Sequence, residues 1–314
     1  MSALLAVKNI SKSYRQQHGI IGSRKFRVLH EISFELARAE ILAVVGESGS
    51  GKSTLARQVV GLEKPDCGDI LFNGRAVADV PDIHQSIRMI FQNPIASLNP
   101  RMRVFQLLEE PLLNYTDNSV SERKEKIEQV LQGVGLDSEQ ASRYPHMFSG
   151  GQRQRLAIAR ALILQPELIV ADEAVSALDV SVQAQILNLV LKLKAEHGMA
   201  WLFIAHDINV VRAIADRVIV LYAGRVMETG SVSDVLQNPL HPYTRELLDS
   251  APGNVELAGS TDVRLSEIDV DSDVLQQGCV YQMRCPLADE QCAAAAPAMK
   301  TSADRSVACF HVGT

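Results

Sequence analysis

The sequence lacks the features that mark membrane-spanning, secreted or nucleic-acid-binding proteins. Among its 314 residues, no apolar run reaches the roughly 18 residues that a membrane span needs. The first residues, MSALLAVKNISKSY, contain no basic region leading into an apolar core, so we expect no secretory signal. The net charge of −6 argues against a general nucleic-acid binder, which carries a basic face. We therefore expect a cytosolic globular protein.

Cysteine is scarce over most of the chain. Cys67 stands alone, and the other four cysteines all lie between residues 279 and 314. No two of them have the C-x-x-C spacing that is typical of a structural zinc knuckle. In a reducing compartment, such a cluster favours a metal site over disulfides. Free or buried thiols are the alternative interpretation.

Glycine, in turn, is concentrated in the stretch GESGSGKST, residues 46–54. The stretch follows the apolar run Ile41–Val45 and precedes a helix-compatible run, and this context predicts a phosphate-binding loop. Its glycines let the backbone approach an anion, its lysine adds positive charge, and its serine hydroxyl suits Mg²⁺. The candidate nucleotide-binding residues here are Gly46, Ser48, Gly49, Gly51, Lys52, Ser53 and Thr54.

Apolar patterning along the rest of the chain predicts an α/β fold. Short strand-like runs alternate with amphipathic helical runs, which is typical of a mostly parallel sheet covered on both faces. A polar loop is expected over 15–27. The expected strands are 5–14, 29–36, 41–45, 68–74, 86–91, 168–170, 200–205, 217–222 and 225–228, and the expected helices are 54–62, 104–113, 122–134, 152–164, 180–196 and 209–215.

The same patterning predicts the domain organisation. Residues 1–250 are expected to form a nucleotide-binding domain, into which a helical subdomain over about 99–151 is inserted. A polar, acidic and aperiodic stretch over 251–273 is interpreted as a linker. Residues 274–314 then form a small Cys-bearing extension.

Two carboxylates end one of the expected strands. In LIVADE, residues 168–173, Asp172 and Glu173 follow a buried apolar run. Ligands of open α/β sheets bind at the carboxyl ends of the strands. Asp172 is therefore a candidate for the Mg²⁺ shell, and Glu173 is a candidate to orient or deprotonate a water.

A second candidate anion site precedes the helix expected over 152–164. In FSGGQ, residues 148–152, a serine and two glycines open that helix. A plain serine N-cap explains the same residues. Because one ATP rarely needs two such cradles from a single chain, we interpret this one as serving a neighbouring subunit.

Taken in order, these motifs resemble those of the ATP-binding subunits of ABC transporters over about residues 5–250. GESGSGKS resembles Walker A, FSGGQRQR the signature and LIVADE Walker B. Gln92 falls at the Q-loop, SALD (176–179) at the D-loop, His206 at the switch histidine and Tyr14 at the adenine-stacking aromatic residue. The resemblance implies a P-loop ABC ATPase: a mostly parallel sheet flanked by helices, an antiparallel β subdomain and the inserted helical subdomain.

The resemblance also implies how ATP and Mg²⁺ are bound and used. Two subunits close around two ATP molecules, each lying between one Lys52 loop and the other subunit's signature. Ser53 and Gln92 contact Mg²⁺ while Asp172 holds its shell, Glu173 polarises the attacking water, and His206 contacts the γ-phosphate. The implied catalytic residues are Glu173, His206 and Gln92, and the nucleotide-binding residues outside the phosphate loop are Tyr14, Ser149, Gly150, Gly151, Gln152, Asp172 and Asp179.

A narrower resemblance points to importers of peptides and nickel. The segments IFQNPIASLNPR (90–101) and NPLHPYTRELL (238–248) and the tail GCVYQMRCPLADEQC (278–292) resemble that group, and most closely the F-type ATPases of dipeptide permeases. It implies an ATP-hydrolysing translocase subunit at the cytoplasmic face of the inner membrane. Its partners would be a second, unlike ATPase, two transmembrane permeases and an extracytoplasmic solute-binding protein, with no nucleic acid. A nickel or metal-chelate importer and a non-transport ABC ATPase are the alternatives.

The resemblance assigns the cysteine cluster as well. It implies a [4Fe–4S] cluster on Cys279, Cys285, Cys292 and Cys309, with zinc as the alternative. In one place the chain departs from the family, because Ala174 stands where a proline usually follows the Walker B glutamate. This frees φ and restores an N–H, which can loosen the loop while the carboxylate is kept.

Overall fold

The computed structural model describes residues 3–18, 22–93, 98–176, 178–250 and 278–312. The predicted linker over 251–273 lies outside these residues. None of the helices within them combines the length and the apolarity that a bilayer crossing requires.

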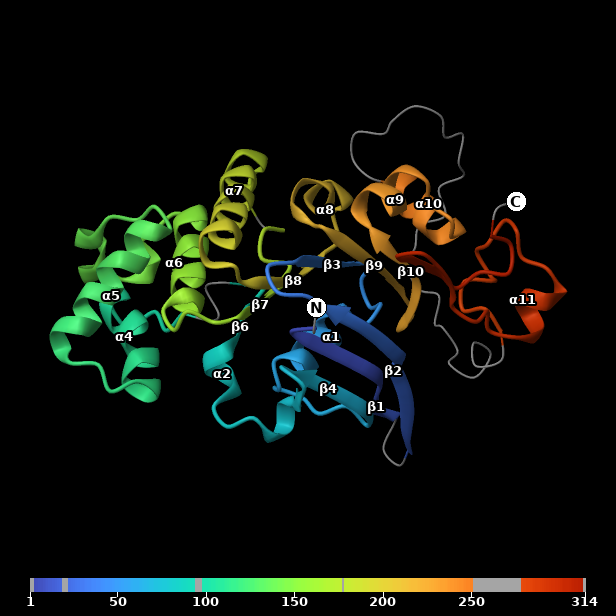
Figure 1. Cartoon of the computed structure of the whole chain (residues 1–314), viewed down its shortest axis with the longest axis horizontal. Helices are drawn as coiled ribbons and strands as arrows, with labels where there is room; N and C mark the ends of the chain where they lie inside the picture. Colours follow the sequence, from blue (N-terminus) through green and yellow to red (C-terminus); the bar gives the residue numbers. More distant parts are fainter. Residues whose placement is uncertain (1–2, 19–21, 94–97, 177, 251–277, 313–314) are drawn as a thin grey trace.

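The described strands form two sheets, so the predicted α/β fold is confirmed (Figure 1). One is antiparallel and four-stranded, in the order β2-β1-β4-β5, and the other has eight strands in the order β11-β12-β10-β9-β3-β8-β7-β6. The strands are β1 (Leu5–His18), β2 (Gly22–Leu36), β3 (Ile41–Val45), β4 (Cys67–Phe72), β5 (Arg75–Ala76), β6 (Ile87–Ile90), β7 (Leu168–Asp172), β8 (Ala200–Ala205), β9 (Arg217–Tyr222), β10 (Arg225–Ser231), β11 (Lys300–Ser302) and β12 (Arg305–Val307).

Helices cover the larger sheet on both faces. The helices are α1 (Lys52–Val59), α2 (Ile83–Ser86), α4 (Val104–Tyr115), α5 (Val120–Gly133), α6 (Gly150–Leu162), α7 (Val180–His197), α8 (Ile208–Ile214), α9 (Val232–Gln237), α10 (Pro242–Asp249) and α11 (Glu290–Ala294). Short 3₁₀ turns occur at Val77–Asp79, Ser138–Ser142 and Pro145–Met147.

The centre of the larger sheet is parallel and buried on both sides. Strand β3 pairs in parallel with β8 and β9, and β7 joins β8 to β6. Leu42 and Val44 belong to the apolar core that includes α1 and the four-stranded sheet, whereas Ala43 and Val45 belong to the core beneath α6, α7 and α8. This two-sided burial explains why β3 is apolar throughout.

The predicted polar loop over 15–27 was wrong. Strand β1 continues to His18 and β2 begins at Gly22, so the two form a long antiparallel ribbon in which Arg15 pairs with Lys25. Main-chain pairing between the two strands supplies the hydrogen bonds here. Because the ribbon needs no continuous apolar face at this point, hydrophobic alternation did not reveal it.

Helices α4 and α5 lie within the insertion predicted over about 99–151, and α6 follows them, so that all three lie between β6 and β7 in sequence. The bounds of a helical subdomain stay a prediction. Helix α5 starts with a capping box, in which the Ser119 Oγ accepts from the Glu122 N–H at 3.3 Å and the Glu122 carboxylate accepts from the Ser119 N–H at 2.6 Å. Figure 1 places α4 and α5 at one end of the long axis and the C-terminal segment at the other.

The C-terminal segment is continuous with the larger sheet. Strand β12 pairs with β10, so that Glu228 lies opposite Val307 and Thr229 opposite Ser306. Helices α9 and α10, which no periodic pattern predicted, lie between β10 and this segment in the chain. The division into a domain over 1–250 and an extension over 274–314 stays a prediction.

Candidate functional site

The phosphate loop connects the end of β3 to the start of α1, as the motif predicts. A Cβ added to Gly46, which has a φ of +156°, would lie 2.0 Å from the Leu221 carbonyl oxygen. At Gly51, which has a φ of +101° and forms the N-cap of α1, a Cβ would lie 2.7 Å from Leu29. Only glycine fits these two positions, and no side chain caps the helix. The first amides of α1 are therefore available to an anion.

Lys52 lies at the start of this helix and is nearly buried. Its Nζ donates to the carbonyl oxygens of Gly46 and Glu47, each at 2.7 Å. Burial lowers the pKa of Lys52, and the nearby carboxylates of Glu173 and Asp172 act in the opposite direction. The ammonium is thus held inside the loop, where an incoming phosphate would neutralise it.

Ser53 is hydrogen-bonded to Asp172, the first of the two carboxylates at the end of β7. Its Oγ donates to Asp172 Oδ1 at 3.1 Å, across 119 positions of the chain. Burial raises the pKa of Asp172, although the hydrogen bond from Ser53 lowers it. A hydroxyl and a carboxylate at this distance form a donor set that fits Mg²⁺.

The three predicted catalytic residues also come together. Gln92 Nε2 donates to Glu173 Oε2 at 2.8 Å, and His206 Nδ1 lies 3.6 Å from the same oxygen. Gln92 and His206 are exposed, and Glu173 is partly buried, so the group faces solvent. Gln92 and His206 thus converge on one carboxylate oxygen of Glu173, whose charge acts on Lys52 of the phosphate loop.

The backbone around Glu173 is held by three hydrogen bonds. Its N–H donates to the Ile204 carbonyl at 3.1 Å, and its own carbonyl accepts from the Ser176 N–H at 3.1 Å and from the Ser176 Oγ at 2.9 Å. Glu173 has a φ of 47°, which is uncommon for a residue other than glycine. Ala174 is buried. That alanine in place of the usual proline at this position loosens the loop stays a prediction.

Tyr14, the predicted adenine-stacking residue, lies on β1 beside α1. Its hydroxyl donates to the Glu63 carboxylate, and its ring centroid lies 6.1 Å from that of Phe26. Burial and the bond to Glu63 raise the pKa of Tyr14, whereas a hydrogen bond with Thr54 lowers it. The contact with Thr54 places the tyrosine at the phosphate loop, although its role toward adenine stays a prediction.

The signature residues lie apart from this group. Ser149 is the N-cap of α6, and its Oγ and Gln152 close a capping box through hydrogen bonds of 3.3 and 3.0 Å. Within the described residues, the hydrogen bonds of Ser149 go to Gln152 and to α6, not to the phosphate loop. Ser149 and Gly150 are exposed, as is Asp179 at the N-cap of α7. Any ligand that they bind would approach from outside the chain.

The four C-terminal cysteines gather in one place, while Cys67 is exposed on β4. Cys279 donates its N–H to the Cys292 carbonyl at 2.8 Å, and all four are unpaired. Burial raises the pKa of Cys279, and the thiols of Cys292, Cys285 and Cys309 raise it further, so the four lie within electrostatic reach of one another. Clustered sulfur donors fit a soft metal centre. Asp289 and His311 bring ligand atoms to within 4.8 Å of the Cys292 sulfur.

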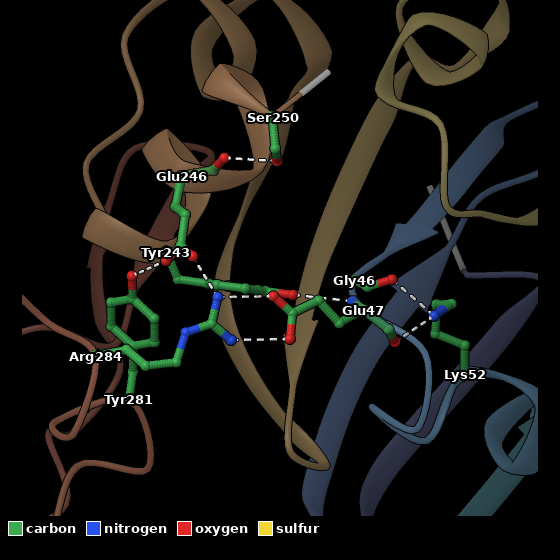
Figure 2. Close-up of polar contacts among 8 residues, drawn as sticks. All are labelled: Gly46, Glu47, Lys52, Tyr243, Glu246, Ser250, Tyr281 and Arg284. Atoms are coloured by element: carbon green, nitrogen blue, oxygen red, sulfur yellow. Dashed lines mark hydrogen bonds and ion pairs between the residues drawn. The ribbon is translucent and has the colours of Figure 1, made fainter. Parts of the chain in front are cut away.

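Sequence reasoning missed one part of the site. Arg284, from the cysteine-bearing segment, donates to both carboxylate oxygens of Glu47 in the phosphate loop, each at 3.0 Å (Figure 2). The Tyr243 hydroxyl on α10 accepts from the Glu47 N–H at 2.9 Å. Since 237 positions separate Arg284 from Glu47, no local pattern could have predicted this contact.

Two family models match the chain. Residues 29–176 match the model described as ABC transporter. Residues 227–292 match the model described as oligopeptide/dipeptide transporter, C-terminal region.

Curated relatives match nearly the whole length. The chain is 43% identical over 322 residues to the di/tripeptide transport ATP-binding protein DppF of Pseudomonas aeruginosa, covering 99% of this chain and 98% of that protein. It is 43% identical over 297 residues to the oligopeptide transport ATP-binding protein OppF of Escherichia coli, covering 92% of this chain and 89% of that protein.

Solved structures match the cassette fold. A dimeric, post-hydrolysis form of the ATP-binding cassette MJ0796 bound to ADP and Pi has a TM-score of 0.64 and 30% identity, covering 73% of this chain and 98% of that chain. The protein cbiO1 of Clostridium perfringens, part of the ABC transporter complex cbiONQ, has a TM-score of 0.66 and 26% identity, covering 76% of this chain and 92% of that chain.

Proposed function

This chain belongs to the ATP-binding subunits of ABC transporters, in the dipeptide and oligopeptide group, and from that premise we propose that it hydrolyses ATP to drive peptide import. One observation carries the proposal. Lys52, the Ser53–Asp172 pair and the group around Glu173 converge at the carboxyl ends of β3, β6, β7 and β8.

In the proposed reaction, a water attacks the γ-phosphorus of ATP. Glu173 Oε2 takes the proton of that water while the bond from the γ-phosphorus to the bridging oxygen of ADP breaks. Gln92 and His206 would orient the Glu173 carboxylate for this role, since Gln92 donates to the same oxygen and His206 Nδ1 lies 3.6 Å from it. His206 would then contact the γ-phosphate.

Binding of the nucleotide rests on the remaining residues. Lys52 would move from the loop carbonyls to the β- and γ-phosphates. Ser53, Gln92 and Asp172 would hold Mg²⁺, which neutralises charge on the phosphates when bound. Tyr14 would stack on adenine.

The test of the proposed base is Glu173→Gln, which keeps the shape of the side chain. Because a general base contributes about 10²- to 10⁴-fold, we expect hydrolysis to fall at least about 100-fold while MgATP binding is kept. The control is Glu196→Gln, an acid on α7 whose ion pair with Lys192 is exposed. Turnover of Glu173→Gln close to that of the control, in the assembled transporter, would refute the role of Glu173.

We propose that the signature completes the site of a second ATPase. Ser149, Gly150 and Asp179 are exposed, and the related MJ0796 cassette is dimeric. The second subunit is proposed to be an unlike homologue, so that a heterodimer works with two permeases and a solute-binding protein at the cytoplasmic face of the membrane. Co-purification from cells that express the neighbouring genes tests these partners, and uptake of labelled dipeptide against Ni²⁺ tests the solute.

We also propose that Cys279, Cys285, Cys292 and Cys309 hold a [4Fe–4S] cluster, with zinc as the alternative. The convergence of the four thiols and the burial of three of them, Cys279, Cys292 and Cys309, support this assignment. The cluster would staple a segment that is too short to build its own core. Protein purified without oxygen should contain stoichiometric iron and absorb in the visible range. Colourless protein containing zinc would favour the alternative, and protein without either metal would refute both.

A further inference from the structure

The cysteine-bearing segment reaches the phosphate loop through one arginine. Arg284 binds both carboxylate oxygens of Glu47, the residue directly after Gly46 (Figure 2). The same guanidinium also donates to the carboxylate of Glu246 on α10. One cation thus serves two acids, and one of these acids is part of the nucleotide site.

Arg284 is held firmly in this position. Its side chain is only 15% exposed, and the centre of the guanidinium lies 5.7 Å from the Tyr222 ring centroid and 5.8 Å from that of Tyr281. The Tyr281 hydroxyl donates to Glu246, and the Cys285 N–H donates to the Tyr281 carbonyl at 3.0 Å. Two aromatic rings and a bidentate carboxylate restrict the guanidinium to one geometry.

Glu47 passes this contact on to Lys52. Its carbonyl oxygen accepts from Lys52 Nζ at 2.7 Å, and its N–H donates to the Tyr243 hydroxyl at 2.9 Å (Figure 2). Its carboxylate is close enough to Lys52 to interact with it electrostatically. Without a counter-charge, that carboxylate would repel the phosphates of an approaching nucleotide. Arg284 supplies the counter-charge.

We propose that Arg284 is a positioning residue of the nucleotide site, which neutralises Glu47 and fixes the carbonyls that hold Lys52. The affinity for MgATP and MgADP then depends on a segment more than 200 positions away in the chain. The inference rests on the proposed function, since it takes the loop to bind these nucleotides. Because Arg284 acts through Glu47, it should affect Kd and KM far more than kcat.

The experiment measures the Kd for MgADP, which is not hydrolysed, by calorimetric titration of the full chain. We expect Arg284→Gln to weaken binding about tenfold, because it leaves two carboxylates without their cation. Adding Glu47→Gln to this variant should restore Kd to within about threefold of the Glu47→Gln protein, since the repelling charge is then gone. Arg284→Lys, which keeps the charge but not the bidentate geometry, should lie between wild type and Arg284→Gln.

The matched control is Lys300→Gln, another cation of the same segment. Its Nζ donates to the Phe310 carbonyl at 3.3 Å, away from the phosphate loop, so its Kd should equal that of the wild type. An unchanged Kd for Arg284→Gln would overturn the inference, as would a loss that Glu47→Gln does not restore. If the wild-type chain binds MgADP normally, either of these results leaves the proposed function intact. A wild-type chain that does not bind MgADP would overturn both the inference and the proposed function.

Discussion

A buried carboxylate fastens the C-terminal segment to the body of the protein, and we predict that its removal lowers the melting temperature strongly. Glu228 on β10 is 0% exposed. It accepts from the N–H groups of Leu240 and His241, each at 3.0 Å, and from Arg305 of β12, whose Nε lies at 3.1 Å. The Glu228→Ala variant would leave both amides without this acceptor and would remove the carboxylate that pairs with the Arg305 cation, which would keep its hydrogen bond to the Asn238 carbonyl. Breaking a buried pair in this way costs about 3–5 kcal/mol, so we expect the melting temperature to fall by on the order of 10 °C.

The assay combines thermal melting with amide hydrogen exchange. Exchange of Arg305–Val307 should accelerate most, because among the described strands β12 joins the rest of the sheet through β10, and its other neighbour is the short edge strand β11. The control is Glu167→Ala, whose ion pair with Arg38 at 2.6 Å is exposed and therefore worth only about 0–1 kcal/mol. If Glu228→Ala melted like the control and protected β12 as wild type does, the proposed anchoring role would be refuted.

Two further predictions concern helix α10 and its contact with the loop. Burial lowers the pKa of His241 to about 4, against 6.5 in the unfolded chain. The contribution of the neutral imidazole to stability is therefore complete above pH 6.5 and is lost as the pH falls toward 4. His241→Asn keeps an acceptor for the Tyr243 N–H but cannot titrate, and its melting temperature should fall less over this pH range; an equal fall would contradict the assignment to His241. Tyr243→Phe removes the acceptor of the Glu47 N–H and should cost about 1 kcal/mol of unfolding free energy in urea titrations, whereas an unchanged midpoint would show that water replaces it.

Several features of the site could be predicted from the chain alone because they are local. The loop from Gly46 to Ser53 lies between one strand and one helix, and its glycine spacing reports the backbone geometry directly. The contact of Ser53 with Asp172 is not local, yet it was predictable. Both residues follow buried parallel strands, whose carboxyl ends meet at one edge of the sheet.

Other features followed no local pattern. The ribbon of β1 and β2 takes its hydrogen bonds from pairing between polar strands, so its length could not be judged from hydrophobic alternation. Helix α10 is short and begins at a histidine cap followed by a proline, and its buried Tyr243 contacts residues far away in sequence, Glu47 and Tyr281. The addition of β12 to the edge of the large sheet likewise depends on a partner strand about 80 positions earlier.

By itself, the sequence determined the phosphate-loop motif of an ATP-binding subunit, and it predicted which residues surround the phosphates of a bound nucleotide. Glycine spacing and acidic strand ends allow this because they act over short distances or at a common sheet edge. Only the tertiary structure decided that Arg284 joins that site through Glu47. An ion pair across 237 positions leaves no periodicity or spacing in the chain. It forms only when the folded sheet, α10 and the C-terminal segment bring two opposite charges together.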